Sequence, residues 1–85
     1  MTLKMQYEHD HNKCMEECLE LATVLAHKQN KPNKDFTKHI EEEIADVYFR
    51  LEKVSHYYNW VSITERIKIK KLKEQKKLDS SLESS

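Results

Sequence analysis

The feature that most constrains the fold of this chain is the complete absence of glycine, together with a single proline among 85 residues. Tight turns between strands need residues that tolerate positive φ, and glycine is the main one. Phosphate-binding loops and dinucleotide folds are also built on glycine-rich turns. The composition therefore argues against a sheet protein, excludes the glycine-rich nucleotide folds, and predicts an all-α chain.

The length of the chain allows one domain and only a small core. A chain of this size buries roughly 60–65% of its surface on folding, so a lone monomer is weakly stabilised. No apolar run approaches the ~18 residues of a membrane span, and no signal-peptide pattern begins the chain. We therefore expect a cytoplasmic protein with no membrane partner that works as a homo-oligomer.

The formal net charge is zero, but the charges are unevenly distributed. Residues 1–60 contain 8 Lys and Arg against 11 Asp and Glu, whereas residues 61–85 contain 7 against 4. The basic segment between Arg66 and Lys77 raises the hypothesis of nucleic-acid binding. However, it contains no aromatic residue and no motif that recognises nucleic-acid bases. The acidic half would also repel a phosphate backbone, so nucleic acid is the least favoured partner.

Hydrophobic periodicity predicts three helices. They are expected at about residues 12–30, 36–58 and 63–78. Residues 1–11 are polar and weakly patterned, and are expected to form a loose N-terminal arm. Residues 1–79 would form a single helical domain, and the Ser-rich residues 80–85 a disordered tail.

The expected helix starts are marked by residues whose side chains can cap a helix. Asn12 would cap the first helix, and either Asp35 or Thr37 the second. A capping box beginning at Ser62 would open the third helix.

The strongest turn signal is the segment Asn-Lys-Pro-Asn-Lys-Asp at residues 30–35. A turn this short makes the first two helices an antiparallel hairpin. The apolar residues of the second helix follow a 4-3-4-3-4 spacing typical of helix pairing. They are Ile40, Ile44, Val47, Leu51, Val54 and Tyr58. Such a stripe also fits a non-catalytic helical module that pairs with itself or with another protein.

Two pairs of acidic residues stand out because each has the same place beside its helix's apolar stripe. On a helix, residues three apart lie one turn apart on one face, as do Glu17 and Glu20, and likewise Glu43 and Asp46. In an antiparallel hairpin, residues at equal distances in sequence from the turn face each other. Glu17 and Asp46 are equally far from the midpoint between Lys31 and Pro32, where the turn is expected, and so are Glu20 and Glu43. The hairpin should therefore bring four carboxylates to one level.

Carboxylates gathered at this density repel one another unless a cation compensates them. Mg²⁺ prefers oxygen ligands and also binds phosphates, so a magnesium site is one interpretation. The other is a solvated acidic surface with Lys and Arg partners. Arg50 lies four residues after Asp46, where it would either pair with that carboxylate or contact a phosphate.

The acidic motifs resemble those of a known enzyme family. Residues 16–20, Glu-Glu-Cys-Leu-Glu, read as EExxE, and residues 43–46, Glu-Ile-Ala-Asp, read as ExxD. Their order, separation and hydrophobic frame resemble the MazG-like branch of the all-α nucleoside triphosphate pyrophosphohydrolases, especially its short phage and bacterial members. The similarity covers about residues 12–58, and the third helix loosely.

The resemblance implies hydrolysis of a (deoxy)nucleoside triphosphate to the monophosphate and pyrophosphate, with Mg²⁺ as cofactor and Mn²⁺ as its substitute. A bacterial cell or a phage-infected host would be the setting. The implied metal ligands are Glu17, Glu20, Glu43 and Asp46. Glu16 and Glu17 would act on the attacking water, and the implied phosphate contacts are Arg50, Lys68 and Lys71.

The resemblance further implies a dimer or tetramer in which two hairpins complete a four-helix bundle. Lys68 and Lys71 correspond to basic residues of the family's third helix, although a solvated basic face is the alternative for both. The Asn and the Arg-Tyr pair with which some members bind nucleotide are not found after Asp46, so base and sugar specificity stay open.

Overall fold

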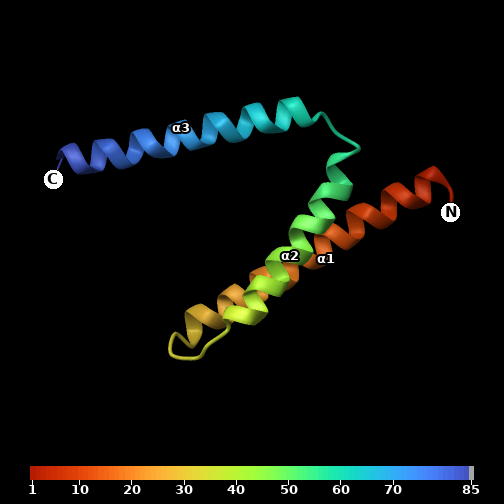
Figure 1. Cartoon of the computed structure of the whole chain (residues 1–85), viewed down its shortest axis with the longest axis horizontal. Helices are drawn as coiled ribbons and strands as arrows, with labels where there is room; N and C mark the ends of the chain where they lie inside the picture. The colour runs from red at the N-terminus through yellow and green to blue at the C-terminus, as the bar shows by residue number, and fades with distance from the viewer. Residues whose placement is uncertain (85) are drawn as a thin grey trace.

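The protein is all-helical in a computed structural model that describes residues 1–84, with side chains as far as Ser81. Its elements are α1 (Leu3–Asn30), α2 (Thr37–Ser55) and α3 (Trp60–Ser84), and the described residues contain no strand. The all-α class with a hairpin and a third helix is thereby confirmed. Figure 1 shows α1 and α2 side by side as an antiparallel hairpin, while α3 runs away from the end of α2.

The first helix begins nine residues earlier than predicted. Thr2 caps α1, because its hydroxyl oxygen accepts a hydrogen bond of 3.1 Å from the backbone N–H of Met5. Asn12 lies inside the helix and caps nothing. The prediction that residues 1–11 form a loose arm is therefore wrong, because hydrogen bonds to Tyr57 and Tyr58, in the turn after α2, give this segment tertiary partners.

The second helix begins close to the predicted residue. The carboxylate of Asp35 accepts a hydrogen bond of 2.9 Å from the backbone N–H of Thr37, so the expected acidic residue satisfies a free donor at this end. The helix ends at Ser55, three residues before the predicted end. There the N–H groups of Tyr57 and Tyr58 donate to the carbonyls of Val54 and Ser55, both at 3.0 Å, which closes a tight turn.

The third helix is longer than predicted at both ends. Asn59 opens it, since its side-chain oxygen accepts a hydrogen bond of 3.1 Å from the backbone N–H of Ser62. Ser62 is therefore inside α3, and the capping box expected there is wrong. The tail expected to be disordered at residues 80–85 is helical as far as Ser84, and Ser85 lies outside the described residues.

The turn between α1 and α2 is held without any residue at positive φ, a conformation that occurs nowhere in the described chain. The ammonium group of Lys28 donates to the carbonyls of Pro32 at 2.9 Å and Lys34 at 3.1 Å. Both bonds satisfy backbone carbonyls that the turn leaves unpaired. The absence of glycine is thus compatible with the sharp reversal that forms the hairpin.

The core of the hairpin is small. Its buried apolar residues are Cys14, Val24 and Val47. Ile44 and Leu51, although they belong to the predicted stripe of α2, are 40% and 46% exposed. The chain measures 57 × 37 × 15 Å, so its three helices form a single layer. No described helix has both the length and the apolar character needed to cross a bilayer.

Candidate metal centre

Three carboxylates from the two helices of the hairpin converge at one place. Glu17 of α1 and Glu43 and Asp46 of α2 each offer one oxygen, and these three oxygens lie within 4.8 Å of one another. Oxygen ligands on a Mg²⁺ ion at ~2.1 Å are separated by about 3–4 Å, so small side-chain movements would bring the three onto one cation. We call Glu17, Glu43 and Asp46 the carboxylate cluster.

Two oxygens of the cluster are buried without a partner. Oε2 of Glu17 and Oε2 of Glu43 are almost inaccessible to solvent, and neither accepts a hydrogen bond from any described group. Buried polar atoms in folded proteins are almost always paired, because each unpaired one keeps its full cost of desolvation. A cation between the helices is the simplest group that would satisfy both oxygens.

One cluster residue has an imidazole neighbour on its own helix. The Oε1 atom of Glu43 lies 3.4 Å from Nε2 of His39, one turn earlier, and the Glu43 side chain is only 13% exposed. This pair occupies Oε1 of Glu43 and leaves Oε2 without a hydrogen-bond partner among the described groups. The sequence analysis missed His39, although its spacing of four residues from Glu43 was a readable signal.

The electrostatic environment of Glu17 disfavours its negative charge. Loss of solvation raises the pKa of the Glu17 carboxyl, the charges of Glu20 and Asp46 raise it further, and the nearby Arg50 lowers it. Repulsion between carboxylates therefore outweighs the single positive charge at this position. A bound divalent cation would reverse that balance.

A hollow of about 310 Å³ lies beside the cluster, on the side of the hairpin that carries Glu20. Its lining consists of Leu19, Glu20, Thr23, Val24, His27, His39 and Glu43. Glu20 and Glu43 thus line the same hollow from opposite helices of the hairpin, but Glu20 is not one of the three residues of the carboxylate cluster. It lies at the rim, where it would face whatever occupies the hollow.

The remaining predicted site residues are placed differently. Glu16 is exposed and forms an ion pair of 3.1 Å with Lys13, away from the cluster. Arg50 is half-buried on α2; it forms no ion pair with Asp46, and its guanidinium lies 5.1 Å from the centre of the Phe49 ring. Lys68 and Lys71 are exposed on α3, which does not pack against the hairpin.

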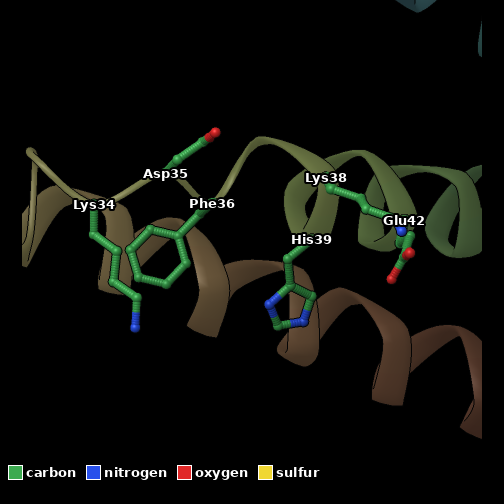
Figure 2. Close-up of a pocket in the computed structure, with 6 residues that line it drawn as sticks. All are labelled: Lys34, Asp35, Phe36, Lys38, His39 and Glu42. Atoms are coloured by element: carbon green, nitrogen blue, oxygen red, sulfur yellow. The ribbon is translucent and has the colours of Figure 1, made fainter.

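A second, larger hollow lies at the start of α2 and shares His39 with the first. It has a volume of about 490 Å³ and is lined by Lys34, Asp35, Phe36, Lys38, His39 and Glu42. Figure 2 shows Phe36 and His39 directed toward α1, whereas Asp35 points away from it. The ammonium group of Lys34 lies 5.3 Å from the centre of the Phe36 ring.

No family model matches the chain, and neither a curated protein nor a solved structure matches it.

Proposed function

We propose that the protein hydrolyses a nucleoside triphosphate to the monophosphate and pyrophosphate with the help of Mg²⁺ held by the carboxylate cluster. The observation that carries this proposal is the pair of buried, unpartnered oxygens on Glu17 and Glu43. They come from two helices and lie beside a third carboxylate, that of Asp46. The resemblance of the EExxE and ExxD motifs to the MazG-like enzymes supports the choice of reaction.

The donor set supports a hard cation. All three groups are carboxylates, and Mg²⁺ and Mn²⁺ prefer oxygen ligands. The exposed position of Asp46 leaves one side open to solvent, where water and the phosphates of a substrate would have access to a bound cation. Glu20, at the rim of the adjoining hollow, would be the fourth metal ligand or would bind a water molecule there.

In this reaction a water molecule attacks phosphorus and the pyrophosphate group leaves. Phosphoryl transfer needs alignment and neutralisation of charge more than covalent catalysis, which is what bound Mg²⁺ supplies. Glu17 would orient the water or accept its proton, because its carboxylate lies in the cluster that would hold Mg²⁺. The same role for Glu16 would require its side chain to leave Lys13. Arg50 would hold a phosphate.

The working unit would be a homo-oligomer, a dimer or a tetramer, in which two hairpins complete a four-helix bundle. The apolar residues exposed on the single-layer chain support this, because they have no covering element within it. Lys68 and Lys71 would then reach the polyphosphate only from another copy, since α3 leaves its own hairpin.

The proposal is tested by incubating the purified protein with Mg²⁺ and a panel of ribo- and deoxynucleoside triphosphates, and separating the products. Monophosphate and pyrophosphate in equal amounts are expected from at least one substrate. Glu43→Gln should lose at least ~100-fold in rate, whereas Glu42→Gln, an equal charge change at an exposed neighbour on α2, should retain activity. The proposal would be contradicted if no nucleotide of the panel gave these products, or if Glu43→Gln kept full activity.

A second candidate function is a non-catalytic helical module that kept the scaffold and lost turnover. The exposed apolar residues of α2, Ile44 and Leu51, favour it. The same panel separates the two functions, because a binding module would form oligomers and release no pyrophosphate.

A further inference from the structure

Among the described residues, α3 packs along neither of the other two helices. Only α1 and α2 pack along each other, and α3 extends from the end of α2 as a free rod (Figure 1). Stable domains consist of at least two packed layers, but this chain is only 15 Å thick. A helix of 25 residues that packs on nothing gains no burial energy to offset its ordering entropy, so α3 needs a surface from outside the chain.

The hairpin carries an uncovered apolar surface on the side away from Glu20. Nε2 of His11 on α1 and the hydroxyl oxygen of Tyr58, in the turn that follows α2, lie 2.7 Å apart, so this side of α1 lies beside the end of α2. Residues seven apart share a helix face, so the side of α1 that carries His11 continues through Cys18 and Leu25. On α2, Ile44 and Leu51 are seven residues apart and lie on the side of Val47 away from Asp46. The apolar flank consists of four exposed residues, Cys18, Leu25, Ile44 and Leu51.

The third helix presents a matching surface. Trp60, Ile63 and Ile67 lie on one face by their spacing of three and four, and we call them the apolar strip. Trp60 is 60% exposed and Ile67 is 42% exposed. Trp60 and Ile67 are seven residues apart, as are Ile44 and Leu51, which is about 10 Å along either helix. The apolar strip therefore has the length of the α2 part of the apolar flank.

The charges on the two surfaces are complementary. Next to the apolar strip, the spacing 4-3-4 aligns a row of exposed cations, the basic row Arg66, Lys70, Lys73 and Lys77. No ion pair among the described side chains involves any of them. The hairpin has an excess of acidic residues, and two exposed ones, Glu41 and Glu52, border the apolar flank.

We propose that two copies of the chain form a dimer by exchanging α3, so that the apolar strip of each copy packs on the apolar flank of the other. The basic row would then lie along the acidic border of the second copy's hairpin. A second copy is the occupant that the charges favour, because one chain carries both an acidic hairpin and a basic helix and is neutral as a whole. The exchange uses the flank opposite Glu20, so it forms whether or not the carboxylate cluster hydrolyses nucleotides. In this dimer Lys68 and Lys71 stand away from the hollow beside Glu20, so the phosphate contacts proposed for them would need a second pair of chains, as in a tetramer.

Filtered NMR on a mixed sample, one half isotope-labelled and the other unlabelled, tests this arrangement directly on the full chain. Intermolecular contacts are expected between methyl groups of Ile63 or Ile67 and those of Ile44 or Leu51. A monomer, contacts of α3 with its own hairpin only, or a dimer joined by hairpins without α3 would each overturn the proposal.

A matched pair of variants tests the charge complementarity. Lys70→Glu with Lys73→Glu reverses the middle of the basic row, and should raise the dimer dissociation constant at low salt by at least ~10-fold. Lys68→Glu with Lys76→Glu makes the same change in charge on the other side of α3. This pair should raise the dimer dissociation constant by less than ~3-fold. Equal effects of the two pairs in sedimentation equilibrium would overturn the proposed orientation of α3. Circular dichroism checks that both variants stay helical.

Discussion

Glu17 on α1 and Glu43 on α2 each bury one carboxylate oxygen that has no hydrogen-bond partner among the described groups. Two such atoms are a source of instability in the metal-free chain, and the same atoms would bind a cation. Stability and metal affinity should therefore change in opposite directions when either residue is neutralised.

Glu17→Gln should stabilise the protein in the absence of divalent metal. Since burial and the neighbouring acids raise the pKa of Glu17 above its ordinary value of 4.5 in the folded state, ionisation of this group opposes folding. Its cost is absent at low pH and appears as the pH rises through the raised pKa. Thermal melts from pH 4 to pH 8 with a chelator present should show a smaller loss of stability with rising pH in the variant. An identical pH dependence would mean that Glu17 titrates normally.

Mg²⁺ should stabilise the wild-type protein against heat. A ligand at ten times its dissociation constant stabilises the native state by about 1.4 kcal/mol, which raises Tm by roughly 6–11 °C in a domain of this size. Differential scanning calorimetry should show this rise in the wild type and in Glu42→Gln, but not in Glu43→Gln. A rise of equal size in all three proteins would place the binding of Mg²⁺ elsewhere.

Tyr57→Phe should loosen the N-terminal third of α1. The hydroxyl of Tyr57 donates a hydrogen bond of 2.7 Å to the carboxylate of Asp10, which is 4% exposed, and this bond lowers the pKa of Asp10. Such a carboxylate stabilises the fold above its ordinary pKa of 3.8 and loses that effect as the pH falls through its lower folded value. The variant should melt on the order of 5 °C lower at neutral pH.

Two measurements distinguish the loss of the Tyr57–Asp10 bond from a general loss of stability. The difference in Tm between Tyr57→Phe and the wild type should shrink as the pH falls below 3.8 and through the lowered pKa of Asp10, because at the end of that range the carboxyl is protonated in both proteins. Hydrogen exchange at residues 3–10 should accelerate more than at residues 20–28. Uniform acceleration along α1 would mean that the Tyr57–Asp10 bond does not hold this segment in particular.

The N-terminal segment also marks the limit of what the sequence could predict. Residues 1–11 carry no helical periodicity, and their order depends on Tyr57 and Tyr58, about 47 residues away in the chain. Local patterns cannot report such contacts. The hairpin, by contrast, followed from the turn at Pro32, and the approach of Glu17 to Asp46 and Glu43 followed from the register that this turn imposes.

The start of α3 and the exposure of the α2 stripe also differ from what local sequence patterns predict. Ser62 had the better capping box, but Asn59 caps α3, because the turn that ends α2 leaves Asn59 next to the first free N–H groups. The exposure of Ile44 and Leu51 could not be foreseen either. A periodic stripe gives the apolar face of a helix, but not how much of it one neighbouring helix covers.

Val24→Ala should cost about 2 kcal/mol in the free energy of unfolding. Val24 is the most deeply buried apolar residue, 2% exposed, in a core with few other members. Val61→Ala removes the same atoms at a position 70% exposed, outside the apolar strip, and should cost less than ~0.5 kcal/mol. Urea denaturation of both variants measures the difference. Equal costs would show that the hairpin core does not limit stability.

The most direct test of the account is where a divalent cation binds. Mn²⁺ added to the isotope-labelled protein broadens the NMR signals of nearby residues. We predict that broadening centres on Glu17, Glu43 and Asp46, reaches Glu20, and disappears in Glu43→Gln but not in Glu42→Gln. Broadening spread evenly over the acidic surface, or centred on the hollow between Lys34 and Glu42, would contradict the assignment of the carboxylate cluster as the metal site.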